Sequence, residues 1–322
     1  EMVLTITHNG YIKRTSLSTY RSQRRGGRGV QGASSREEDF VEHLFVANTH
    51  SYILFFTDKG KCYWVKVYDI PEGGRAAKGR AIVNLIGCEP DEKVSAFISV
   101  KEFHEDHFVV MATEKGIVKK TKLSAYSNPR KKGIYAVEIR DGDKLIEARV
   151  STGDNDILLG TRNGKSIRFS EEQIRASGRK TMGVKGITLS SDDDRLVGML
   201  LIKREGTVLV ATEKGFGKRT EISQYRAQKR GGKGVLTMKT TEKVGKMVTI
   251  KEVVEKDDLM IITNQGVLIR LPVAQIRSIG RATQGVKLIK LGEGTLVSSI
   301  TRIMSEEEQD EDNNSEPSSD KE

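Results

Sequence analysis

The sequence predicts an all-β fold, a propeller-like ring of six four-stranded blades followed by an acidic tail. Two observations indicate this fold. One pattern of threonine, glycine and tyrosine or isoleucine recurs six times, at intervals of 48 to 56 residues, and that interval is the size of a propeller blade. Hydrophobic residues make up 36% of the 322 residues but aromatic residues only 6%. The core is therefore built largely from Val, Ile and Leu, which favours strands.

The anchor of each repeat is a glycine that follows a threonine by three positions. The pairs are Thr7 and Gly10, Thr57 and Gly60, Thr113 and Gly116, Thr161 and Gly164, Thr212 and Gly215, and Thr263 and Gly266. A short apolar run precedes each pair, such as YILFFT at 52–57. This arrangement predicts a β-hairpin whose glycine has a positive φ.

Further apolar runs close each unit, such as EKVSAFISV at 92–100, so that each repeat holds about four short strands. The repeats start near residues 3, 52, 108, 156, 206 and 258. One such unit cannot bury both of its faces, so we expect the six to stack into a closed or nearly closed ring over residues 1–304.

Two further positions recur after each anchor. Ten residues after it stand Tyr20, Ile70, Tyr126, Ile174, Tyr225 and Ile276. A residue of this kind in every unit is expected to pack in the core. A second glycine follows the anchor by nineteen residues in five repeats and by seventeen in the third: Gly29, Gly79, Gly133, Gly183, Gly234 and Gly285.

The loop before the second glycine is basic in every repeat. It reads QRRGGRG at 23–29 and QKRGGKG at 228–234. Glycines expose backbone N–H groups and allow close approach, while Arg and Lys supply charge, a combination that suits a phosphate backbone. A second basic column lies four residues after each anchor, with Trp64 as the exception.

These two sets of residues make up the predicted DNA-binding surface. They are Gln23, Arg24, Arg25, Gly26, Gly27, Arg28, Gly29, Arg14, Arg75, Lys78, Arg80, Lys120, Arg130, Lys131, Lys132, Arg168, Arg179, Lys180, Arg219, Lys229, Arg230, Lys233, Arg270 and Arg281. For any one loop, a solvated turn rich in Lys is an equally good interpretation. Recurrence in every repeat favours a basic outer rim.

Charge divides the chain into two parts. Residues 305–322 contain nine acidic residues and one lysine, and the remaining 304 residues contain 53 basic and 35 acidic residues. A body with a net charge of +18 suits a polyanion such as nucleic acid, although a basic surface kept for solubility has the same charge. The tail has almost nothing to bury and is expected to be disordered.

Other functions have weaker support. The glycines at 27, 29 and 32 match a dinucleotide fingerprint, but no strand leads directly into them. His104 and His107 are expected in a surface turn, without further metal ligands nearby. Cys62 and Cys88 lack CxxC spacing and suit reduced thiols in an intracellular protein. No apolar run approaches the roughly 20 residues of a membrane helix, and we expect no signal peptide.

The heptapeptide QRRGGRG at 23–29 resembles the signature box of the gyrase A family, the A subunits of bacterial DNA gyrases. That box lies in the first blade of the family's C-terminal domain, a six-bladed β-pinwheel, and the six repeats over 3–304 match that architecture. The copy at 228–234 departs from the box only by Lys229 and Lys233. The resemblance implies a domain that bends and wraps duplex DNA around its rim, largely without sequence specificity.

The resemblance also implies a division of labour. The domain itself has no catalytic residue and no cofactor or metal, while ATP and Mg²⁺ are used elsewhere in the holoenzyme. The implied partners are double-stranded DNA, the gyrase B subunit, and the rest of the gyrase A subunit, in an A₂B₂ heterotetramer. The implied location is the cytoplasm, at the nucleoid. No membrane contact is expected, and the isolated domain is expected to be monomeric.

Two alternatives remain open. The first is the C-terminal domain of the topoisomerase IV counterpart of gyrase A, in which the box is degenerate or absent and blades are often fewer. The second is a propeller that serves as a protein-interaction platform, which predicts mixed surface charge and apolar patches instead of a basic loop in every repeat.

Overall fold

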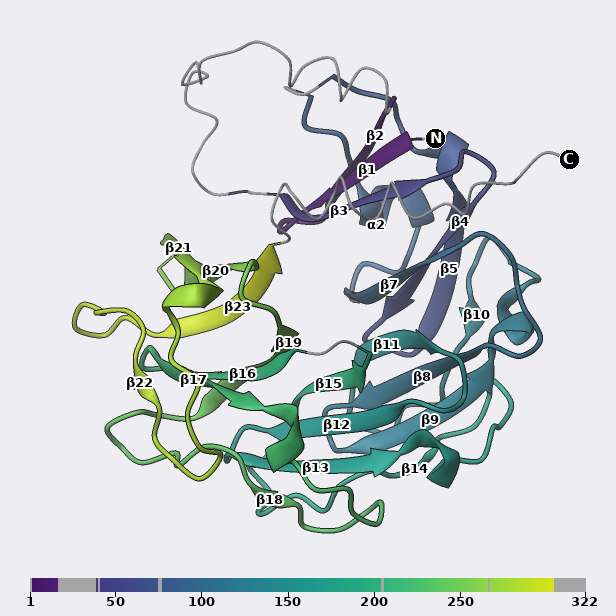
Figure 1. Cartoon of the computed structure of the whole chain (residues 1–322). Helices are drawn as coiled ribbons and strands as arrows, with labels where there is room; N and C mark the ends of the chain where they lie inside the picture. The colour runs from purple at the N-terminus through teal and green to yellow at the C-terminus, as the bar shows by residue number, and fades with distance from the viewer. Residues whose placement is uncertain are drawn as a thin grey trace, which may run out of the picture.

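A computed structural model describes residues 2–16, 39, 41–74, 77–203, 206–265 and 267–303. This part of the chain forms six antiparallel sheets, five with four strands and a sixth with three. The sheets follow one another around a ring in chain order, and each is one blade (Figure 1). The predicted all-β ring of six blades is confirmed. The acidic tail at 305–322 lies outside the described residues.

Each repeat begins with a hairpin. The hairpin strands are β1 (Met2–Thr7) and β2 (Tyr11–Ser16), β4 (Tyr52–Thr57) and β5 (Lys61–Lys66), β8 (Phe108–Thr113) and β9 (Ile117–Lys122), β12 (Asp156–Thr161) and β13 (Lys165–Ser170), β16 (Thr207–Thr212) and β17 (Phe216–Glu221), and β20 (Asp258–Thr263) and β21 (Leu268–Pro272).

The predicted turn chemistry is confirmed in these hairpins. Gly60 has φ +80°, and its N–H donates to the carbonyl of Thr57. The Thr57 hydroxyl in turn accepts a bond of 3.3 Å from the amide of Lys61. The other described anchor glycines have φ between +80° and +85°, a region that favours glycine. Gly266 lies outside the described residues.

The third strand of each blade lies at the inner edge of its sheet, toward the centre of the ring (Figure 1). These strands are β3 (Val41–Ala47), β7 (Val94–Val100), β11 (Leu145–Ser151), β15 (Leu196–Ile202), β19 (Met247–Val253) and β23 (Val297–Ile303). Inner strands of neighbouring blades contact one another, including β23 of the sixth blade and β3 of the first.

In the first five blades, the outer strand comes from the following repeat. These two-residue strands are β6 (Arg80–Ala81), β10 (Ile134–Tyr135), β14 (Val184–Lys185), β18 (Val235–Leu236) and β22 (Val286–Lys287). In the third blade, for example, β14 of repeat 4 pairs with β9 of repeat 3. Repeats 2 to 6 therefore each give their fourth strand to the blade before them, an exchange that repeat length alone does not predict.

The core lies between blades. Along β4, Ile53 and Phe55 pack with the first blade, while Leu54 and Phe56 pack with the third. Both faces of a blade are thus covered, which explains why these runs are continuously apolar instead of alternating. In repeats 2 to 6 the tyrosine or isoleucine column is core as predicted: Ile70, Tyr126, Ile174, Tyr225 and Ile276 are each at most 2% exposed. Tyr20 lies outside the described residues.

Short helical turns follow the hairpins. They are the 3₁₀ turns η1 (Val67–Asp69), η2 (Leu123–Tyr126), η3 (Glu171–Gln173), η4 (Ile222–Gln224) and η5 (Val273–Gln275), and α2 (Ile82–Ile86) lies in repeat 2. Within the described ranges, no helix has the length and apolar character needed to cross a membrane.

Candidate nucleic-acid interface

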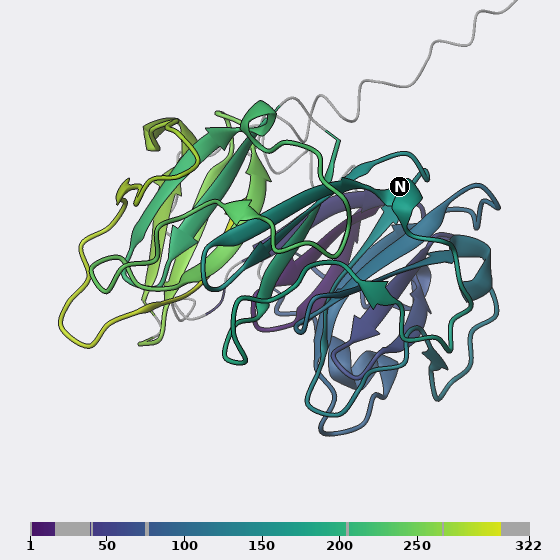
Figure 2. The same cartoon turned by 90° about the horizontal axis from the view of Figure 1, so that it is seen from below.

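The predicted basic loops lie along the outer edge of the ring. Each runs from a helical turn to an outer strand, and we call these loops, at 71–79, 127–133, 175–183, 226–234 and 277–285, the rim loops; residues 75 and 76 of the first lie outside the described residues. The outer strands β10, β14, β18 and β22 lie at the edge of the molecule in Figure 1, and Figure 2 shows the same ring from below. The signature box at 23–29 and Arg75 lie outside the described residues.

The second glycine joins each rim loop to the preceding repeat. Gly183 has φ +90°, and a Cβ atom there would lie 2.4 Å from the carbonyl oxygen of Val118; at Gly234 the same test gives 2.3 Å from Ser166. Such distances exclude a side chain. These glycines therefore allow the rim loop to lie close to the backbone of the neighbouring blade.

Eight of the predicted residues present their charge to solvent. They are Lys78, Arg80, Arg130, Lys131, Lys132, Lys180, Lys229 and Lys233, and all are exposed. Among the described residues none of them forms an ion pair with a carboxylate. Lys78 lies over the ring of Tyr11, with 4.1 Å from Nζ to the ring centroid. These side chains can bind an anion without first breaking an ion pair.

Three other loop residues, which we call the loop arginines, bind the protein itself. Arg179 donates to the carbonyl of Tyr135 at 3.0 Å, Arg230 to that of Lys185 at 2.5 Å, and Arg281 to that of Leu236. In each case the acceptor is the second residue of the outer strand contributed by the preceding repeat. The loop arginines therefore connect consecutive rim loops.

The column four residues after each anchor was expected to add to the basic rim, but most of its side chains are buried or bound within the protein. Lys120 and Arg219 are each only 7% exposed. Arg14 and Arg168 are half-buried, and Arg270 is exposed but bound to Asp258. Three of these arginines reach the next repeat: Arg14 donates to Ile70, Arg168 to Tyr225 and Arg219 to Ile276, all at carbonyl oxygens.

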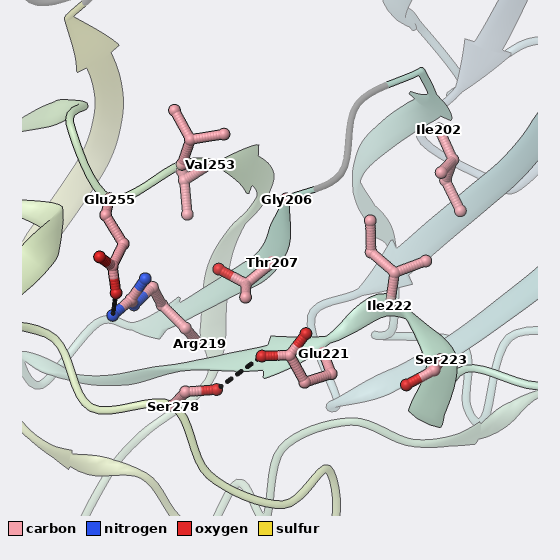
Figure 3. Close-up of a pocket in the computed structure, with 11 residues that line it drawn as sticks. Ile202, Gly206, Thr207, Arg219, Glu221, Ile222, Ser223, Val253, Glu255 and Ser278 are labelled. Carbon is pink, nitrogen blue, oxygen red and sulfur yellow. Dashed lines mark hydrogen bonds and ion pairs between the residues drawn. The ribbon is translucent and has the colours of Figure 1, made fainter.

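The surroundings of Arg219 show why this column is not free for phosphate. Its guanidinium lies in an open pocket formed by repeats 4, 5 and 6, beside Glu255 (Figure 3). Nη2 is 3.5 Å from Glu255 Oε1, and nearby Ser278 Oγ donates to Glu221 at 3.5 Å. The guanidinium of Arg219 binds the Ile276 carbonyl and the Glu255 carboxylate between blades. The sequence shows the charge of this column but not its partners.

A third basic column is not among the predicted binding residues. Arg175, Arg226 and Arg277 each follow the buried tyrosine or isoleucine by one residue, and all three are exposed in rim loops. Arg21 occupies the same position in repeat 1, one residue after Tyr20. Alignment of the repeats at that offset is the signal that could have found them.

The histidine pair forms a turn, as expected. The amide of His107 donates to the carbonyl of His104 at 3.3 Å, in the connection between β7 and β8. In the portion of the chain with described coordinates, no cluster of three or more His, Cys, Asp or Glu side chains could hold a metal ion.

Fold and surface together define a basic β-propeller of six blades, and comparison with known proteins identifies the family. The model of the DNA gyrase C-terminal domain, a β-propeller, matches residues 1–48, 51–101, 107–152, 155–203, 206–253 and 257–303. The chain belongs to this family. It is 47% identical to the DNA gyrase A subunit of Staphylococcus epidermidis over 311 residues and to that of Staphylococcus aureus over 321 residues.

Those alignments cover 96% and 99% of the chain but 35% and 36% of the relatives. The chain thus spans about a third of their length. Among solved structures, the C-terminal domain of DNA topoisomerase IV matches with a TM-score of 0.84 and 25% identity, covering 94% of this chain and 93% of that one. A DNA gyrase A C-terminal domain matches with a TM-score of 0.71 and 23% identity, covering 94% and 99%.

Proposed function

We propose that this domain binds duplex DNA along its outer edge and bends it around the ring, largely without sequence specificity. The observation that carries the proposal is the recurrence of exposed Arg and Lys side chains in the rim loops of consecutive blades. Phosphates recur at a regular spacing along DNA, so a surface with recurrent cations can contact several of them at once.

The proposed contacts are the eight exposed loop residues described above, together with Arg175, Arg226 and Arg277 and the box at 23–29. Bending 20–30 bp of DNA by 40–90° costs on the order of 1–6 kcal/mol. Distributed phosphate contacts, each releasing counterions, can offset that cost without reading bases. The energetics therefore favour a non-specific wrapping surface.

Within the whole enzyme, we propose that the domain belongs to a DNA gyrase A subunit that forms an A₂B₂ assembly with the gyrase B subunit, located at the nucleoid. In this division of labour the domain has no catalytic residue and no cofactor of its own. ATP and Mg²⁺ act elsewhere in the holoenzyme, and bending of DNA by the domain serves negative supercoiling.

Salt dependence of DNA binding tests the proposal directly. The logarithm of affinity should fall steeply with the logarithm of salt concentration, by about 0.9 for each neutralised phosphate. Fluorescence anisotropy on duplexes of several lengths and two unrelated sequences would measure this slope. A shallow slope, or strong preference for one short sequence, would contradict the proposal.

A second candidate is the corresponding domain of topoisomerase IV, favoured by the higher TM-score of that structure. A topology assay separates the two candidates. Relaxed circular DNA is incubated with the domain and a type I topoisomerase, and the linking number is then measured. Wrapping with a constant handedness changes the linking number, whereas binding without wrapping leaves it unchanged and would favour the second candidate.

A further inference from the structure

A lysine three residues after the anchor glycine occurs in every second repeat. Repeats 1, 3 and 5 have Lys13, Lys119 and Lys218, while repeats 2, 4 and 6 have Tyr63, Ile167 and Ile269 at the same position. The odd repeats also share a threonine two residues further on: Thr15, Thr121 and Thr220. The ring is thus three copies of a two-blade unit as well as six copies of one blade.

Each of these lysines reaches the rim loop of the next repeat. Lys119 Nζ donates to the carbonyls of Ala136 and Arg179, both at 2.7 Å. Lys218 Nζ donates to the carbonyls of Gly280, at 2.8 Å, and of Arg281.

Lys13 binds the rim loop of repeat 2 in the same way. Lys13 Nζ donates to the carbonyls of Gly74 and Ala77, both at 2.9 Å. All three ammonium groups thus bind the backbone of an even-numbered rim loop. The carbonyls of Arg179 and Arg281 belong to two of the loop arginines, so in repeats 4 and 6 one loop residue is held through both its side chain and its backbone.

Burial leaves the ammonium groups of Lys119 and Lys218 few alternatives. Lys119 is 1% exposed and Lys218 has no exposed surface. Burial, with the nearby guanidinium groups of Arg179 and Arg281 as a second cause, lowers the pKa of Lys119 and of Lys218 to about 8. A buried charge is costly unless it is hydrogen-bonded, and the described partners are the loop carbonyls and the Thr283 hydroxyl. Neither lysine can reach a phosphate at the surface.

We propose that Lys13, Lys119 and Lys218 are positioning residues that set the conformation of every second rim loop and so the placement of its exposed cations. The inference rests on the proposed DNA-binding function. In repeat 4, Lys119 holds the carbonyl of Arg179, and the next residue is the exposed Lys180. Lys119 therefore acts on DNA through the position of Lys180, without touching DNA itself.

The even repeats supply the means to test this role. Ile167 and Ile269 occupy the lysine position in blades that fold, so an apolar side chain is compatible with the fold there. Lys119→Met keeps the length of the side chain and removes the hydrogen bonds. The matched control is Ile167→Met, at the same position of the next repeat, where no ammonium is lost.

The first readout needs no DNA. In Lys119→Met, hydrogen exchange of the amides at 177–183 should become about tenfold faster, the factor that corresponds to one lost hydrogen bond to a charged group. The amides at 228–234, in an odd-numbered loop, should keep their rates, as should both loops in Ile167→Met. Unchanged exchange at 177–183 in a folded Lys119→Met chain would overturn the proposal, whatever the DNA results.

The second readout is the salt dependence of DNA affinity. Lys180→Ala and Lys119→Met should each lower the slope by about 1, as for one lost phosphate contact. Combined, the two substitutions should also lower it by about 1, because both remove the same contact. A lowering of about 2 in the double variant, or none in Lys119→Met, would overturn the inference while leaving DNA binding established. Absence of any salt dependence in the unmodified chain would instead contradict the proposed function.

Discussion

The ammonium nitrogen of Lys120 lies 3.9 Å from Oε2 of Glu171, and the Glu171 side chain has no exposed surface. Lys120 belongs to β9 of repeat 3 and Glu171 begins η3 of repeat 4. The carboxylate also accepts bonds from Ser151 Oγ at 2.7 Å and from the amide of Asn155 at 2.8 Å. The pair is an ionic contact between two neighbouring blades.

Lys120→Met should therefore lower the free energy of unfolding by about 3 kcal/mol, because it leaves a buried carboxylate without its cation. Urea denaturation would measure the change. Lys122→Met is the matched control: its exposed partner Glu105 lies 3.8 Å away, and surface ion pairs are worth about 1 kcal/mol or less. If Lys120→Met instead lowered the salt slope of DNA binding at unchanged stability, Lys120 would be a DNA contact after all.

The rim loop of repeat 5 contains both exposed lysines, which are proposed to bind DNA, and an arginine that binds the protein itself. Lys229→Ala together with Lys233→Ala should lower the salt slope by about 2 and leave stability unchanged, since both side chains are exposed. Arg230→Ala should mainly lower stability, because the guanidinium binds the carbonyls of Gln173 and Lys185. Anisotropy titrations and thermal unfolding of both variants decide this, and equal effects of the two variants on both quantities would contradict the distinction.

The signature box at 23–29 is expected to be required for DNA wrapping. Replacing Arg24, Arg25 and Arg28 with alanine should remove the change in linking number and leave much of the affinity, because the other rim loops still hold phosphate. The linking-number assay and an anisotropy titration are run in parallel, and an unaltered linking-number change in the triple variant would refute the prediction.

Gly183→Ala should lower stability by at least about 2 kcal/mol, since φ is +90° and the new Cβ would lie 2.4 Å from a backbone oxygen. The control is Gly178→Ala, five residues earlier in the same loop. No atom lies within 4 Å of a Cβ placed at Gly178, and its φ is not positive. Denaturation curves that coincide for the two variants would show that the backbone approach at Gly183 is not needed.

Stability should rise as pH increases from about 8 to about 10, a window below the ordinary lysine pKa of 10.5. The pKa of Lys119 and of Lys218 is about 8 in the folded chain, so over this window the unfolded chain binds more protons than the folded one. Above pH 10 the trend should reverse, because burial raises the pKa of Tyr63, Tyr126 and Tyr225. Urea unfolding at several pH values tests this, and Lys119→Met with Lys218→Met should flatten the rise.

Much of the fold follows from local turn chemistry and could be predicted. Thr57 and Gly60 form their turn from residues three apart, so spacing alone indicates the hairpin. The strand exchange could not be predicted, because which sheet Val184 and Lys185 join depends on packing between repeats. The same limit applies to charge. Lys229 and Arg230 are adjacent and both basic, yet one faces solvent and the other binds a carbonyl of the preceding repeat, which only the assembled ring determines.

The exchange of outer strands also determines how the ring carries load. A force that separates the second blade from the third has to detach Ile134 and Tyr135 of repeat 3 from Cys62 and Lys61 of repeat 2. Neighbouring blades are therefore joined through backbone hydrogen bonds between strands. Elastic recoil of a stiff polymer bent around the edge would be borne by these ladders, and no blade could unfold alone without loosening its neighbour.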